Sequence, residues 1–182
     1  MKIAIIVLCT LASVLAASPV RADNARLTSL YEEDQSDRKP SQRPLSGDQI
    51  VQRDVQRQET VIEIMRAGGV VSANDFFHAA MVFQHSDAAD DNALAYGLAV
   101  TAARIDPSNK MAKWLSAAAW DRALMRKNKP QWYGTQFVKN SDTGKWELYR
   151  VDEDAVTDED RERTGVPPLA KQREREKQLN AE

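Results

Sequence analysis

The chain has little cysteine: one residue in 182, Cys9, which lies in an apolar run near the N-terminus. We expect this run to be removed as a targeting segment, which leaves no thiol in the remaining chain. Disulfides, thiolate catalysis and cysteine metal sites are then excluded together. Leu8, rather than a small residue, precedes Cys9, and this disfavours lipid attachment at the cysteine.

A large excess of charge of one sign is also absent. The sequence has 25 lysine and arginine residues against 27 aspartate and glutamate residues, a formal net charge of -2. A protein that coats nucleic acid needs a net basic face, so we expect no nucleic-acid partner. The charged fraction of 29% and the hydrophobic fraction of 42% favour one globular domain over this length.

The one long apolar run extends from Ile3 to Ala17 and follows Lys2. A basic residue, an apolar run and then small residues are typical of a secretory signal, so we expect residues 1–22 to be a signal peptide, cleaved after Ala22 or about five residues earlier. A retained membrane anchor is the alternative, but about 15 apolar residues are fewer than the roughly 20 that span a bilayer. The expected location is the periplasm or the extracellular medium, with no membrane attachment after signal removal.

Helical periodicity dominates the rest of the chain. Ser46 with Gln49, and Ser72 with Asp75, have the spacing of capping boxes and precede apolar residues at helical intervals. We expect a mainly α fold, a compact helical domain of about five to six helices over residues 23–170. The expected helical segments are residues 24–38, 46–68, 72–85, 92–104 and 107–127, a short turn from 157, and 169–179.

Beyond Pro130 the periodicity becomes that of strands. Residues 136–140 and 145–150 flank the turn sequence Ser141-Asp142-Thr143-Gly144, which predicts a small C-terminal β-hairpin near 136–150. Residues 171–182 have mixed charge and few apolar residues, and we expect a frayed tail there. Paired helices of this kind occur in solenoid repeats, but one visible copy is fewer than the roughly three that an independent array needs.

Polar residues on apolar helical faces indicate where a site can lie, because a buried charge must be paired or must serve a ligand. Gln84 and His85 end the most apolar predicted helix. Asp121 and Arg122 lie at the edge of an apolar stripe on the helix expected over residues 107–127. Loops on rigid scaffolds often bind ligands, and residues 131–136 form a polar and aromatic passage of this kind. We predict that these groups converge on one polar pocket. The apolar stripe consists of Met111, Trp114, Leu115, Ala118 and Met125.

The polar residues also occur as ordered blocks along the chain. The blocks are Tyr31-Glu32-Glu33-Asp34-Gln35 with Asp37-Arg38, Gln84-His85, Asp121-Arg122, and Gln131-x-Tyr133-Gly134-Thr135-Gln136. In this order they resemble a bacterial domain-of-unknown-function family over roughly residues 27–169, and the last block is the most specific. That family has no established activity. The resemblance implies a single, mostly helical domain whose polar blocks belong together, and it implies no mechanism.

Three functions are open at this point. The leading one is binding of a small polar ligand or a peptide. The alternative is a metal-independent hydrolase or transferase in which His85 is the general base and Asp121 orients its ring, with Tyr133 or Thr135 on a substrate oxygen. The third is a helical-pair protein-interaction module. The expected ligand-binding residues are Gln84, Arg122, Gln131, Tyr133, Thr135 and Gln136.

Each candidate also has a structural interpretation. His85 can cap or pack at a helix end, and Gln131 and Gln136 can satisfy backbone groups where helix meets hairpin. Arg122 can form an ion pair, for which the expected partners are Asp34, Asp37 or Asp121.

Metal and cofactor chemistry have little support in the sequence. His78 and His85 are two helical turns apart, about 10.5 Å along the axis, which is too far to share one metal ion. Motifs for a nucleophile elbow, a phosphate-binding glycine loop, a calcium loop and a zinc helix are missing, so we expect no metal and no cofactor. The four tryptophans can form an aromatic platform, although we expect Trp114 and Trp146 in the core.

Overall fold

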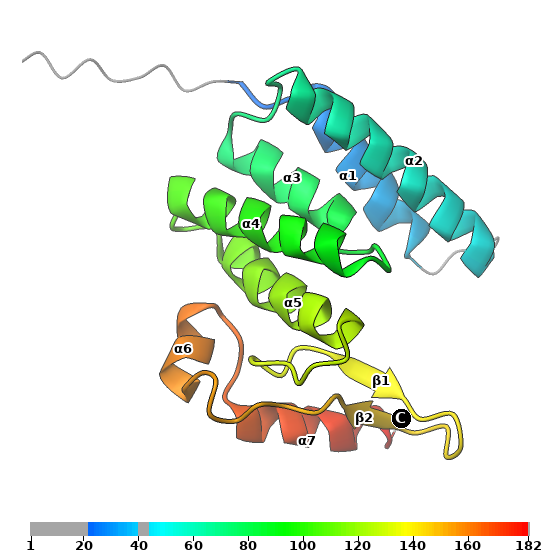
Figure 1. The fold of residues 1–182 in the computed structure, drawn as a ribbon, viewed down its shortest axis with the longest axis vertical. Helices are drawn as coiled ribbons and strands as arrows, with labels where there is room; N and C mark the ends of the chain where they lie inside the picture. The colour runs from blue at the N-terminus through cyan, green and yellow to red at the C-terminus, as the bar shows by residue number, and fades with distance from the viewer. Residues whose placement is uncertain (1–21, 40–43, 182) are drawn as a thin grey trace, which may run out of the picture.

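The structure is a computed structural model that describes residues 22–39 and 44–181. The expected signal peptide lies outside these residues except for Ala22. Within the described ranges the chain forms seven helices and a two-stranded sheet, which confirms the mainly α fold with a small hairpin (Figure 1). The elements are α1 (Ala25–Asp37), α2 (Gly47–Arg66), α3 (Ala73–Phe83), α4 (Ala89–Ile105), α5 (Lys110–Arg126), β1 (Phe137–Lys139), β2 (Trp146–Leu148), α6 (Asp158–Arg163) and α7 (Leu169–Leu179). None of these helices is long and apolar enough to cross a membrane.

Both predicted capping boxes are present at the starts of α2 and α3. The Ser46 side chain accepts from the backbone N–H of Gln49, whose own side chain accepts from the backbone N–H of Ser46. Ser72 and Asp75 form the same reciprocal pair. Each N-cap side chain contributes about 1 kcal/mol, because it satisfies amide groups that have no partner inside the helix.

The start of α5 differs from the prediction. The helix begins at Lys110 with Asn109 as its N-cap, three residues beyond the expected start at residue 107. Asp106 is not available as the cap, because its carboxylate accepts from the backbone N–H and the hydroxyl of Ser108. This local turn satisfies Asp106 before the helix starts.

The core lies along α3, which packs against α1, α2 and α4, while α4 packs in turn against α5 (Figure 1). The helix that is most apolar in the sequence is thus central in the fold, and most of its apolar side chains are buried. The α4–α5 contact is made largely by alanines, which let the two helices approach closely. The buried alanines of these two helices are Ala95, Ala99, Ala102, Ala112, Ala117, Ala118, Ala119 and Ala123.

Two predictions about large side chains are wrong. Met111, expected on the inward stripe of α5, is 54% exposed, because Ala112 and Leu115 occupy the buried side of the helix start. Trp146, expected in the core, is 39% exposed on β2. Trp114 packs only partly against the core.

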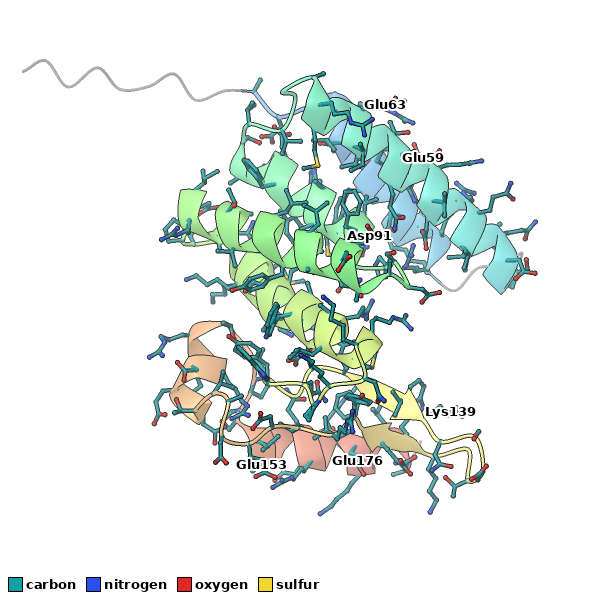
Figure 2. The ribbon with its side chains drawn as sticks, in the orientation of Figure 1. Glu59, Glu63, Asp91, Lys139, Glu153 and Glu176 are labelled. Carbon is teal, nitrogen blue, oxygen red and sulfur yellow. The ribbon has the colours of Figure 1, made fainter. Side chains whose placement is uncertain are left out.

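The charged C-terminal segment forms the predicted helix α7, which contacts the hairpin. The strands pair antiparallel, with Val138 opposite Glu147, and α7 lies along β2. Glu176, labelled in Figure 2, accepts from the backbone N–H of Leu148 at 3.1 Å. Asn180 accepts from the N–H of Trp146 at 2.8 Å and donates to its carbonyl at 2.7 Å. These side chains satisfy the free edge of β2, a role that charge composition does not indicate.

Candidate functional site

A cluster of buried charges joins α1 to α2. Five residues form it, and we call it the α1–α2 charge cluster: Asp34, Asp37, Arg38, Asp54 and Arg57. Arg57 donates to Asp37 at 2.7 Å and to Asp54 at 2.5 Å. Arg38 contacts Asp54 at 2.7 Å and Asp34 at 2.8 Å. The charged residues contributed by each helix are three to four positions apart, so they lie on one face of that helix. The two charged faces contact each other and form one network.

His85, which follows the C-terminal end of α3, lies next to the α1–α2 charge cluster. Its Nε2 lies 3.5 Å from Oδ2 of Asp34, whose side chain is fully buried. Burial raises the pKa of Asp34 to about 6, against the attraction of Arg38 and Arg57. Burial also lowers the pKa of His85 to about 3, and the positive charges of Arg38, Arg122 and Arg57 add to this effect. The imidazole is therefore neutral at neutral pH.

His85 also lines a small cleft between α2 and the turn from α3 to α4. The cleft holds about 170 Å³, and we call it the His85 cleft. Val51 and Val55 of α2, which are 53% and 48% exposed, contribute apolar surface to it. Figure 2 labels Asp91 near the start of α4, where its carboxylate accepts from the hydroxyl of Ser86 at 2.6 Å. The lining residues are Val51, Asp54, Val55, Gln58, His85, Ser86, Asp87 and Ala88.

Hydrogen bonding within the charge cluster is incomplete. Oδ1 of Asp34, Nε of Arg57 and Nε2 of His85 are buried and make no well-aligned hydrogen bond to any described residue. Oδ1 of Asp34 has Arg38 at 2.8 Å and Arg57 Nε at 3.9 Å as ionic neighbours, so its charge is compensated. Buried polar groups in proteins are usually fully bonded, and a local group of unsatisfied atoms indicates a site for water or a ligand.

Arg122 connects this region to the loop after α5. Its NH1 donates to the carbonyl of Gln84 at 2.7 Å, and its Nε donates to Oε1 of Gln136 at 3.2 Å. Burial lowers the pKa of Arg122 to about 10, and the neighbouring cations Arg126 and Arg38 contribute. None of the expected carboxylates forms an ion pair with it in the described chain, because neutral oxygens occupy its donors.

Asp121 holds the loop at residues 131–136 and does not orient His85. Its carboxylate accepts from the backbone N–H groups of Trp132 at 2.8 Å, Tyr133 at 2.9 Å and Thr135 at 3.0 Å, and from the Thr135 hydroxyl at 2.8 Å. Burial raises its pKa, while these hydrogen bonds oppose the change. Both oxygens are thus engaged by the loop, and the expected His85–Asp121 pair is corrected to His85–Asp34.

The two glutamines of the loop bond to backbone groups. Gln131 accepts from the N–H of Gln136 at 2.8 Å and donates to the carbonyls of Gln136 at 2.9 Å and Tyr149 at 2.7 Å. Gln136 donates to the carbonyl of Ala118 at 3.2 Å. Arg161 of α6 donates to the carbonyls of Trp132 and Tyr133. The structural interpretation of these glutamines agrees with their contacts.

The predicted site residues thus form a string of contacts that links the four blocks in order. Asp34 meets His85, the carbonyl of Gln84 meets Arg122, and Arg122 meets Gln136 beside Asp121. The polar groups of Asp121 and Gln131 bond within the loop half of the string, whereas the His85 half has unsatisfied polar atoms beside a cleft.

Sequence reasoning did not select Asp54 and Arg57. Their signal was present, because these two residues precede the buried Val61 by seven and four positions and so lie on its helix face. Opposite charges three residues apart on such a face indicate a buried pair. Among the described residues, no group of three or more histidine, cysteine or acidic side chains is placed to hold a metal ion.

In comparisons with known proteins, no family model, no curated protein and no solved structure matches this chain.

Proposed function

We propose that this protein binds a small, uncharged polar ligand in the His85 cleft. The observation that carries the proposal is the position of His85, whose neutral ring faces a buried carboxylate on one side and borders an open cleft on the other. Perturbed ionisable groups that lie in a cleft are candidates for binding or chemistry.

The state of Asp34 determines which hydrogen bond His85 offers to a ligand. Above pH 6 the carboxyl is ionised, and its negative charge 3.5 Å from Nε2 favours the imidazole tautomer with hydrogen on that atom. Nδ1 then carries a lone pair and has no hydrogen-bond donor within the described part of the chain. A ligand that donates an N–H or O–H group satisfies this atom.

Charge around the cleft favours a neutral ligand. Three guanidinium groups act on the ring of His85, so a cation placed beside it is repelled. Asp54 and Asp87 line the cleft itself and repel an anion. Val51 and Val55 provide room for a short apolar part. The volume of about 170 Å³ is smaller than pockets for drug-sized molecules and suits a small amide, alcohol or peptide side chain.

The test is a screen of the protein against small amides, alcohols and amino-acid amides, with NMR of the imidazole nitrogens of its two histidines. We expect a ligand to shift the His85 signals and to leave those of His78, which stacks on Tyr31, unchanged. His85→Gln removes the response, and the matched variant His78→Gln retains it. Preference for anions, or a response that survives His85→Gln, contradicts the proposal.

A specific observation also favours an enzymatic function of the same cleft. A carboxyl group with a pKa near 6 beside a neutral imidazole can move a proton near neutral pH. The hydrolase or transferase considered from the sequence would then use His85 with Asp34 instead of Asp121. Turnover of a bound amide or ester that is lost in both His85→Gln and Asp34→Asn, at similar melting temperatures, supports this function. An intact ligand after long incubation supports binding alone.

A further inference from the structure

A row of aromatic side chains lies at the other end of the contact string. The ring centroids of Tyr96 and Trp120 are 5.1 Å apart, and those of Trp120 and Trp132 are 5.2 Å apart at an interplanar angle of 66°. These residues come from α4, α5 and the loop after α5, so three separate segments contribute to the row. The distances are those of favourable aromatic pairs.

Trp120 and Trp132 border a cleft of about 380 Å³ that shares no lining residue with the His85 cleft. Leu124 and Pro130 add apolar surface, and Lys129 and Asp152 add polar groups at its edge. The volume lies within the range of known small-molecule sites. We call it the Trp120–Trp132 cleft.

The cleft is held rigidly by hydrogen bonds already described for the loop. Asp121 binds the N–H of Trp132, and Arg161 donates to its carbonyl at 2.9 Å. The carbonyl of Gln131 accepts from the N–H of Asp152 at 2.8 Å, which fixes Asp152 next to the loop. A preformed site loses little conformational entropy when a ligand binds.

We propose that the Trp120–Trp132 cleft binds a neutral saccharide. A pyranose ring has an apolar face of C–H groups, which packs on an indole, and a rim of hydroxyl groups that both donate and accept hydrogen bonds. Asp152 offers an acceptor and Lys129 offers donors, so a hydroxyl rim matches both. Lys127 also lines the cleft, and its charge is compensated by Asp90 at 3.3 Å. The opposite charges of Lys129 and Asp152 balance each other, as suits an uncharged ligand.

A proline-rich peptide is the competing occupant, because such peptides also dock in aromatic grooves. Proline has no backbone N–H, so a polyproline segment cannot donate to the carboxylate of Asp152. Covering that carboxylate without a donor carries a desolvation penalty. The polar groups at the edge of the cleft therefore favour the saccharide.

The experiment is titration of the full chain with cellotriose, maltotriose, triacetylchitotriose and an oligoproline peptide, followed by the indole N–H signals in NMR. We expect at least one sugar to shift the Trp120 and Trp132 signals saturably, and the peptide to have no effect. Trp132→Ala weakens sugar binding on the order of 10-fold, and Asp152→Asn on the order of 3-fold. The matched control Trp146→Ala, on β2 outside the cleft, retains the affinity.

Three results overturn the proposal: no saturable shift with any sugar at about 10 mM, tighter binding of the oligoproline, or equal losses in Trp132→Ala and Trp146→Ala. Trp132→Phe is the second variant, for use if Trp132→Ala does not fold, because phenylalanine keeps an aromatic face at this position. We expect the Trp132→Phe protein to bind the sugar more weakly than the wild type. Asp152 is exposed, so Asp152→Asn tests the polar contact in a folded protein. Since the two clefts share no residue, sugar binding that survives His85→Gln separates this inference from the proposed function.

Discussion

Two buried carboxylates, Asp34 and Asp121, show how similar side chains are used differently in two regions of the molecule. Both are fully buried, and burial raises the pKa of both. Asp121 accepts hydrogen bonds from three backbone N–H groups and one hydroxyl. Asp34 has arginine neighbours, one bond from Gln35 and a histidine ring at 3.5 Å. Saturated bonding indicates a structural anchor, and incomplete bonding beside a cleft indicates a site.

The same substitution at both positions is expected to have the largest effect in this comparison. Asp121→Asn places an amide NH₂ group against backbone N–H donors, and we expect it to reduce the free energy of unfolding by about 3–5 kcal/mol. Asp34→Asn resembles the protonated carboxyl that burial favours, so we expect a change of about 1 kcal/mol or less near pH 4 and no loss of stability at pH 7, where the wild type carries the ionised form. Urea denaturation followed by tryptophan fluorescence measures both.

Asp142→Asn, in the exposed hairpin turn, is the control for a charge change without burial. We expect it to lie within about 0.5 kcal/mol of the wild type. Equal losses at Asp34 and Asp121 would remove the distinction between anchor and site.

The next largest expected effect is the pH dependence of stability that Asp34 and His85 produce. In the folded protein Asp34 keeps its proton up to pH about 6, whereas the unfolded chain releases it near 3.8, so this group lowers stability as pH rises between these values. The effect is about 3 kcal/mol, from the size of the shift. His85 acts in the opposite direction, because the unfolded chain holds a proton between about 3 and 6.5 that the folded ring lacks.

We therefore expect two variants to diverge from the wild type with opposite slopes. Relative to the wild type, Asp34→Asn becomes more stable as pH rises from 4 to 6, and His85→Gln becomes less stable over the same window. Chemical denaturation at a series of pH values gives both slopes. Parallel curves for the two variants would show that these groups do not titrate as the buried contact requires.

The features that could be predicted from the sequence are those set by neighbouring residues. The boxes at Ser46 and Ser72 depend on residues three positions apart, and both formed. The contact of His85 joins residues far apart in sequence, and helical spacing predicts the face of a side chain but not its partner across the core. The bonds of Asp121 go mostly to backbone N–H groups, which every residue type except proline has, so residue types alone do not reveal them.

The smallest predicted effect concerns the end of α7, where Asn180 contacts the edge of β2. Asn180→Ala removes two hydrogen bonds to the backbone of Trp146. We expect the free energy of unfolding to fall by about 1 kcal/mol, because both hydrogen bonds are exposed and water replaces them in part. Amide exchange at Trp146 should accelerate more than exchange within α3, since the edge of β2 opens locally. Unchanged protection at Trp146 would mean that β1 alone orders the strand. The matched variant Lys177→Ala, exposed on the same helix, should leave this protection unaltered.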